Sequence, residues 1–266
     1  MARILAISSQ TVYGPVGNSA AVPALEWLGH TVFAVPTIIL SHHPGHGPPA
    51  GLRVPARDLA AILESLDTVG ALDDCAAVFT GYFAADEQIH AVERVIKRLK
   101  ARSASVRYFC DPILGDDPGG LYVPLPVAEA VRDRLMPLAD AAAPNRFELE
   151  WLTGLEITSV PSAIRVARSL LCRETLATSI PSVDGEIATL VVTKTGAHEQ
   201  FAARRAAVPH GTGDLLSGLY LGHRLNDASP QAALERAAAM LGRVIEVSAG
   251  TAVLDLAKGL RRPTAS

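Results

Sequence analysis

Short apolar runs alternate along the chain with longer segments in which apolar residues recur at helical spacing. Buried parallel strands produce the first pattern and amphipathic helices the second. The apolar runs predict strands at 3–8, 31–37, 76–80, 106–110, 139–143 and 187–193, then a hairpin through 198–208. The amphipathic segments predict helices at 18–28, 56–68, 86–101, 127–136, from 146, 161–175, 214–225, 230–248 and 250–260. Repeated βα units of this kind predict an α/β fold, with a central, mostly parallel sheet between two layers of helices.

The pattern shows no internal repeat and no composition break that would mark a linker. We therefore expect one domain over residues 1–266. One long loop, at about 41–55, is rich in glycine, proline and histidine. Long loops of this kind often act as lids, so we expect a flexible flap there.

Composition narrows the classes of function. Hydrophobic residues make up 49% of the chain and the formal net charge is −3. Such a chain can bury a core, but it lacks the clustered basic charge that nucleic acid requires. Three well-separated cysteines, no signal-peptide pattern and no run of ~18 apolar residues favour a cytoplasmic protein without a membrane span.

Polar residues follow the predicted strands. Ser9, Gly81-Tyr82, Asp111, Asn145 to Glu148 and Thr193 each stand just after one. Because ligands bind at the carboxyl ends of the strands in open parallel sheets, we expect these residues to share a site at that edge.

The stretch His210-Gly211-Thr212-Gly213-Asp214 leads into a segment with helical spacing. A glycine turn that opens a helix places free N–H groups at the positive end of the helix dipole, which suits a phosphoryl group. Asp214 would accept the proton of an attacking hydroxyl. For an isolated aspartate, a capping role would be the simpler interpretation. No Walker sequence and no glycine-rich kinase loop is present, which disfavours P-loop ATPases and protein kinases.

With this motif in hand, the chain resembles the ribokinase superfamily, whose members carry a similar Gly-x-Gly-Asp near the C-terminus. Further blocks resemble the pyridoxal kinase family within it, in the order of that family. They are VYGPVGNSAA at 12–21, TGY at 80–82, CDPILGD at 110–116 with GLYVP at 120–124, and APNRFELE at 143–150.

The resemblance implies phosphorylation of the 5′-hydroxyl of pyridoxal by Mg-ATP in vitamin B6 salvage. Asp214 is then the base, and Gly211, Thr212 and Gly213 form the anion hole. The implied substrate contacts are Ser9, Pro44, Gly45, Tyr82 and Asp214. The implied nucleotide contacts are Asp111, Ala143, Glu148, Thr193, Lys194, His210, Gly211, Thr212 and Gly213. The implied magnesium site is Asp111, Asp116 and Glu148. A homodimer and a role for K⁺ are further implications.

The chain departs from the family pattern in three places. Ser8-Ser9-Gln10 stands where the family commonly has Gln-Ser-His, and the flap reads His42-His43-Pro44-Gly45-His46 instead of an Asn-His-Thr-Gln-Tyr-like form. The stretch from Arg204 to His210 lacks the family's Pro-Val-Gly-Val-Gly form. These changes bear on substrate preference more than on reaction type.

Several alternatives stay open from the sequence. The flap histidines could bind a metal, although structural zinc sites usually have a second ligand pair elsewhere. Asp116 could belong to a plain turn, and Arg204-Arg205 could meet phosphate or solvent. The rival functions are hydroxymethylpyrimidine kinase and a non-catalytic protein that binds B6 vitamers. An NAD-dependent dehydrogenase is disfavoured because no GxGxxG follows the first strand.

Overall fold

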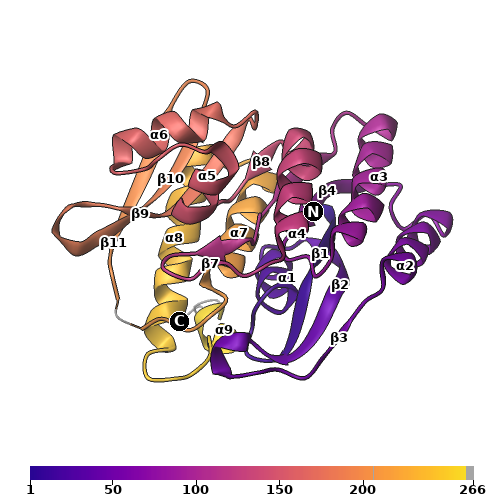
Figure 1. Cartoon of the computed structure of the whole chain (residues 1–266), viewed down its shortest axis with the longest axis horizontal. Coiled ribbons are helices and arrows are strands. Elements are labelled where there is room, and N and C mark those ends of the chain that lie inside the picture. The colour runs from indigo at the N-terminus through magenta and orange to yellow at the C-terminus, as the bar shows by residue number, and fades with distance from the viewer. Residues whose placement is uncertain (206, 262–266) are drawn as a thin grey trace, which may run out of the picture.

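The computed structural model describes residues 1–205 and 207–261. In this part of the chain nine strands form one sheet, in the order β11-β10-β9-β8-β5-β4-β1-β2-β3 (Figure 1). The strands are β1 (Arg3–Tyr13), β2 (Thr31–His42), β3 (Gly51–Arg53), β4 (Cys75–Thr80), β5 (Arg107–Cys110), β8 (Ala141–Ala142), β9 (Glu174–Pro181), β10 (Glu186–Thr193) and β11 (Ala197–Ala203). A separate two-stranded ribbon pairs β6 (Gly115–Asp116) with β7 (Gly120–Leu121).

Six neighbouring strands, from β9 through β8, β5, β4 and β1 to β2, run parallel. The edge strands β3 and β11 are antiparallel to their neighbours, and β10, which lies between β11 and β9, is antiparallel to both. The sheet is therefore mostly parallel, as predicted, and the carboxyl ends of six strands meet at one edge.

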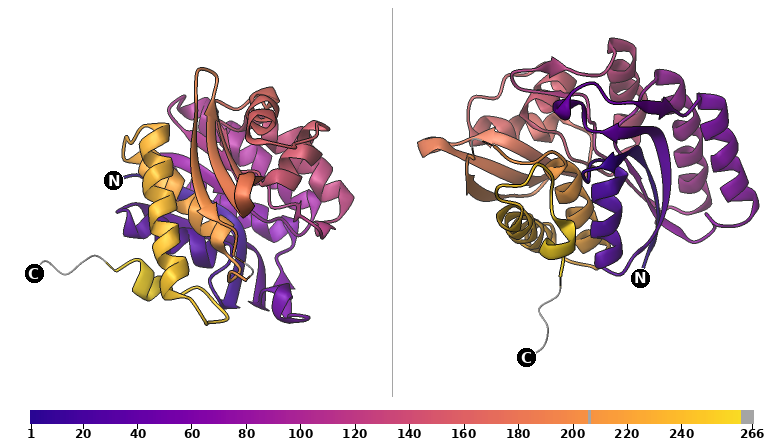
Figure 2. Two further views of the ribbon diagram at one scale, coloured as in Figure 1. Left: turned by 90° about the vertical axis from the view of Figure 1, so that its left-hand side faces the viewer. Right: turned by 90° about the horizontal axis from the view of Figure 1, so that it is seen from below.

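Helices cover both faces of the sheet (Figures 1 and 2). One face carries α2 (Ala56–Thr68), α3 (Asp86–Arg102), α4 (Leu125–Ala130), α5 (Arg146–Thr153) and α6 (Val160–Ser169). The other carries α1 (Asn18–Trp27), α7 (Thr212–Leu225), α8 (Pro230–Val247) and α9 (Leu256–Gly259). Alternation along β1 shows the reason: Leu5 and Ile7 enter one core, whereas Ile4 and Ala6 enter the other. The predicted three-layer α/β fold is confirmed.

Short irregular turns complete the backbone. The chain after α4 continues through a π-helical turn at Val131–Leu135 and a 3₁₀ turn at Met136–Leu138. Two more 3₁₀ turns lie at Pro44–His46 and Val183–Gly185. Among the described residues, no helix is both long enough and apolar enough to cross a membrane.

Four sequence predictions were wrong in detail. The helix predicted at 161–175 ends at Ser169, and the chain then forms β9, which was not predicted. Periodicity cannot separate a short apolar run in a buried strand from a helix. The segment 41–55 is not all loop, because β2 extends to His42 and β3 pairs with it. The segment 115–124, for which no strand was predicted, contains the β6–β7 ribbon. The last helix, predicted at 250–260, covers only Leu256–Gly259. Residue 206 of the expected hairpin and residues 262–266 of the expected domain lie outside the residues that the structure describes.

Candidate active site

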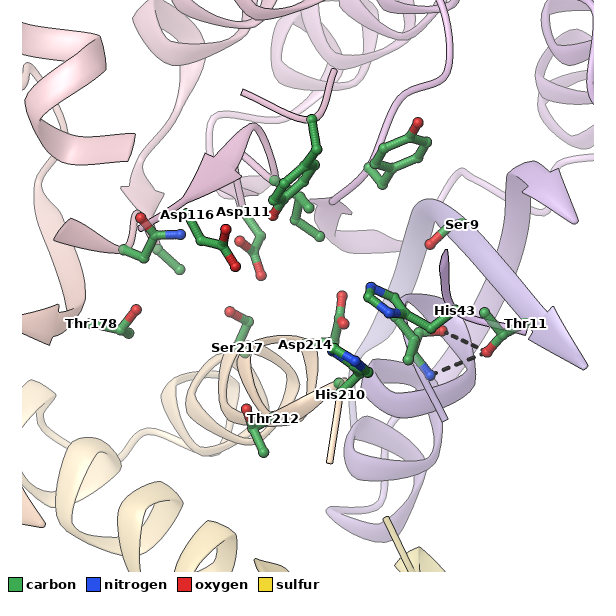
Figure 3. A pocket seen from close by; sticks show the side chains of 18 of the residues that line it. Ser9, Thr11, His43, Asp111, Asp116, Thr178, His210, Thr212, Asp214 and Ser217 are labelled. Atoms are coloured by element: carbon green, nitrogen blue, oxygen red, sulfur yellow. Dashed lines mark hydrogen bonds between the residues drawn. The ribbon is translucent and has the colours of Figure 1, made fainter. Parts of the chain in front are cut away.

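A cavity of about 610 Å³ lies at the edge where the parallel strands end. Its walls come from the ends of β1, β4, β5 and β9, the flap, the start of α5 and the first turns of α7 (Figure 3). Twelve of the residues to which the family resemblance assigns a role line it: Ser9, Pro44, Tyr82, Asp111, Asp116, Ala143, Glu148, His210, Gly211, Thr212, Gly213 and Asp214. The fold thus brings together residues more than 200 positions apart in the chain.

The glycine turn before α7 has the backbone geometry that an anion site needs. Gly211 caps the helix with φ +95°, and a Cβ there would overlap the carbonyl oxygen of Pro15, so only glycine fits. The first intrahelical bond is from Leu215 N–H to Gly211 C=O, at 2.9 Å. The N–H groups of residues 212–214 precede it, so none of them has a carbonyl acceptor within the helix. A Cβ at Gly213 would meet no atom within 4 Å, so this turn is open on the Gly213 side.

Asp214 projects from the first turn of α7 into the cavity (Figure 3). The backbone N–H groups of Gly17, at the start of α1, and of Asp214 itself are near its carboxyl group and act to lower its pKa. Among the described residues its Oδ1 has no hydrogen-bond partner, although that oxygen is buried. Burial raises the pKa of Asp214 to about 6. A carboxylate with one unpaired oxygen and a raised pKa is suited to accept a proton near neutral pH.

Two more buried carboxylates, those of Asp111 and Glu148, line the cavity. Burial, with Asp214 and Glu148 nearby, raises the pKa of Asp111 well above its usual range, and the nearby Ser217 hydroxyl opposes the shift. Burial raises the pKa of Glu148 to about 8. That shift persists even though Glu148 accepts N–H bonds from Leu114 at 2.9 Å and Asn145 at 2.8 Å.

The cavity is acidic. Asp116 and the three buried carboxylates line it, and none of the described lining residues is a lysine or arginine. Such mutual repulsion between buried carboxylates is relieved by a bound cation. Within the described residues, however, no three His, Cys, Asp or Glu side chains converge closely enough to hold a metal ion by themselves.

The opposite end of the cavity is built around Ser9 and Tyr82. Ser9 is 6% exposed and sits at an irregularity in the pairing of β1 with β2. The Tyr82 backbone is held from both sides: its N–H donates to Ser8 Oγ at 3.1 Å, and its C=O accepts from Thr37 Oγ1 at 2.7 Å. Burial raises the pKa of the Tyr82 phenol, so the side chain is neutral at physiological pH.

The chain is similar to several known kinases. The family model described as phosphomethylpyrimidine kinase matches residues 53–256. A pyridoxine/pyridoxal/pyridoxamine kinase of Bordetella pertussis (strain Tohama I) is 37% identical over 266 residues, covering 97% of this chain and 94% of the relative. The pyridoxal kinase of Entamoeba histolytica has a TM-score of 0.91 at 27% identity, covering 98% of this chain and 94% of its own. The Leishmania donovani pyridoxal kinase solved with ADP and pyridoxine has a TM-score of 0.90 at 26% identity, covering 99% and 96%.

The chain belongs to the pyridoxal kinase family. It shares the ribokinase-like fold of that family and is a kinase.

Two of the predicted nucleotide residues lie elsewhere in the kinase. Thr193 ends β10, but β10 runs antiparallel to β9, so Thr193 pairs with Glu174 at the opposite edge of the sheet. Lys194 follows it there and is exposed, and neither residue lines the cavity. The prediction failed because β9 was missed and the strand after it was taken to be parallel. Gly45 is exposed and does not line the cavity, although its neighbour Pro44 does.

The structure supplies residues that the sequence reasoning missed. Thr178 and Ser179 lie where Thr193 was expected, at the carboxyl end of β9, and both line the cavity. Ser179 has φ +57°, an uncommon conformation for a residue other than glycine. Ser217 lines the cavity one turn after Asp214. Recognising β9 would have identified the first two, and the i, i+3 spacing on α7 would have identified the third.

Proposed function

We propose that this kinase transfers the γ-phosphoryl group of ATP to the 5′-hydroxyl of pyridoxal, producing pyridoxal 5′-phosphate in vitamin B6 salvage. The proposal rests on the carboxylate of Asp214, which is buried beside the Gly211–Gly213 turn and has one oxygen without a hydrogen-bond partner among the described residues. The names of the relatives and the solved complex with ADP and pyridoxine support the substrate pair.

Asp214 would take the proton of the substrate hydroxyl as its oxygen attacks phosphorus. The raised pKa of Asp214 makes it a stronger base than a solvated aspartate while leaving it ionised above pH about 6. The N–H groups of Thr212 and Gly213, at the positive end of α7, would stabilise the charge on the transferring group. Ser9, Pro44 and Tyr82 would hold the pyridine ring at the other end of the cavity.

The nucleotide would extend from the Gly211–Gly213 turn toward Ala143 and the end of β9. We propose Thr178 and Ser179 as nucleotide contacts in place of Thr193 and Lys194, with Ala143 and His210 retained from the sequence prediction. No lysine or arginine lines the cavity within the described residues, so the charge of the triphosphate must be balanced by cations.

The residues present fit magnesium. Asp111, Asp116 and Glu148 are oxygen donors on one wall, and Mg²⁺ takes one or two carboxylates together with phosphate oxygens and water. When bound, the ion would neutralise charge on the phosphates. We include K⁺ as a second cation to be tested, and we propose a cytoplasmic homodimer on the basis of the family resemblance.

A coupled assay for ADP release tests the proposal. Pyridoxal, pyridoxine, pyridoxamine, hydroxymethylpyrimidine and ribose are offered separately, with and without Mg²⁺ and K⁺. We expect pyridoxal to have the highest kcat/KM and turnover to stop when EDTA removes Mg²⁺. The second candidate is a hydroxymethylpyrimidine kinase, because the matching family model, described as phosphomethylpyrimidine kinase, points to a pyrimidine substrate. Faster turnover of hydroxymethylpyrimidine would select it, and no turnover of any substrate would favour a binding protein.

A further inference from the structure

Two of the places where the sequence departs from the family pattern meet in the structure. His43 and His46 belong to the altered flap, and His210 belongs to the altered stretch before the glycine turn. The rings of His43 and His210 are stacked, with centroids 3.9 Å apart and planes inclined by 26°. The ring of His46 meets His210 edge-on, at 5.6 Å and 88°. Figure 3 shows the labelled pair His43 and His210 beside Asp214.

The flap turn has a shape that accepts the His210 ring. A Cβ at Gly45 would overlap Nε2 of His210, so the absence of a side chain at this position lets the ring approach the flap backbone. The Gly45 N–H donates to Nδ1 of His43 at 3.0 Å, which orients the His43 ring within its own turn. Burial and the neighbouring His210 lower the pKa of His43 to about 4, so that ring is uncharged near pH 7 and stacks without repulsion.

His210 is also bonded directly to the residue that caps α7. Gly211 is confined by its positive φ and by its contact with Pro15, so the backbone that carries the His210 ring has little freedom. His43 and His210 both line the cavity next to Asp214. The flap is therefore connected to the glycine turn through an aromatic contact as well as through the distant sheet.

We propose that His210 is a positioning residue whose ring, held by His43, Gly45 and His46, latches the flap over the cavity and aligns it with the Gly211–Gly213 turn. A substrate that enters under the flap must open this latch, and the latch closes again before transfer. The kinetic part of the inference rests on the proposed function, whereas the latch itself does not.

Hydrogen exchange of the flap amides tests the latch directly. In His210→Ala, residues 41–53 are expected to exchange about 2- to 10-fold faster than in the parent, the factor that an aromatic pair contributes. His210→Phe keeps a flat ring and should retain the parent's protection. Exchange in β4 and β5 should be unchanged in both variants, which shows that the fold is intact. His198→Ala on β11, away from the cavity, is the matched control and should match the parent.

A double variant tests whether the flap turn and His210 form one unit. A methyl group at Gly45 displaces the His210 ring, so Gly45→Ala should reproduce the exchange of His210→Ala. Gly45→Ala with His210→Ala should be no faster than either single variant, because both remove the same contact. Unchanged flap exchange in His210→Ala, failure of His210→Phe to retain protection, or additive effects in the double variant would each overturn the latch.

Kinetics add a separate readout. With pyridoxal, His210→Ala should raise KM about 2- to 10-fold, and His210→Phe should restore it. If the parent does not phosphorylate pyridoxal, the proposed function fails, but the exchange experiment still decides the latch.

Discussion

Asp214 owes its chemistry to neighbours that are remote in sequence. The packing of α7 against α1 buries it to 7% exposure, and its buried Oδ1 lacks a hydrogen-bond partner among the described residues. An aspartate in the first turn of an exposed helix would be solvated and would serve as a capping group. Here the same residue type is desolvated, and its pKa is raised to about 6.

The pH profile should therefore report Asp214. The proposed base must be ionised, and a raised pKa means that it is protonated below pH about 6. We expect log(kcat/KM) for pyridoxal to be level above pH 7 and to fall as pH drops through about 6, because this ratio follows groups of the free enzyme. Asp214→Asn at pH 8 should lose ~100-fold or more in kcat.

The comparison variant is Glu87→Gln, an exposed acid on α3, which should keep the parent's rate and profile. A parent profile that stays level down to pH 5, or an Asp214→Asn variant with parental kcat, would exclude Asp214 as the base.

At the scale of elements, the position of α7 controls the site. Gly218 on α7 lies against the backbone of Ala21 on α1, where a Cβ would come within 2.8 Å of the Ala21 carbonyl oxygen. This close approach fixes the axis of α7. At the start of the same helix, Gly211 packs against the Pro15 carbonyl, and this contact fixes the position of the glycine turn.

Gly211→Ala should therefore disturb both stability and catalysis. The added methyl group would overlap the Pro15 carbonyl oxygen, and φ +95° is strained for alanine, which together should cost about 1–3 kcal/mol. Urea unfolding monitored by circular dichroism gives the free energy of unfolding.

Gly213→Ala is the matched control for stability. Its Cβ would meet no atom within 4 Å, and alanine favours a helix over glycine, so its free energy of unfolding should equal or exceed the parent's. Equal losses in the two variants would contradict the role given to the Gly211–Pro15 contact.

At the scale of the whole molecule, the fold collects negative charge at one edge of its sheet. Asp111, Glu148 and Asp214 are all buried there, and each has a raised pKa. A raised carboxyl pKa contributes stability below the unfolded-state pKa and loses it as pH rises through the folded-state pKa. The ligand-free kinase therefore gives up stability at neutral pH at the site that we propose for a cation.

Asp111→Asn should make the ligand-free protein more stable. The amide removes a buried charge that Asp214 and Glu148 repel, so Tm at pH 8 should rise, by about 2–4 °C for each 1 kcal/mol gained. The difference from the parent should shrink toward pH 4, where the parent's carboxyl group is neutral. Calorimetry at pH 8 and pH 4 measures both, and a lower Tm than the parent at pH 8 would contradict the repulsion.

Much of the candidate site could be predicted from strand ends alone. Asp111 directly follows β5 and Tyr82 stands two residues after β4, so the carboxyl-edge rule brought them to the cavity correctly. Ser9 also lines the cavity, although β1 does not end at Ser8 as predicted but continues to Tyr13. The rule failed at Thr193, because it assumes a parallel strand and β10 is antiparallel. Direction is decided by which neighbour a strand pairs with, and no local pattern in residues 186–193 records that.

The sequence by itself determined the alternation of strands and helices, the glycine turn before α7 and the order of the family blocks, since these depend on residues close together in the chain. Only the tertiary structure decided that Thr178 and Ser179 face the cavity, that Oδ1 of Asp214 lacks a described partner, and that His43 stacks on His210. The physical reason is that desolvation and contact arise between residues that are remote in sequence, and pairing in the sheet and packing of helices bring those residues together.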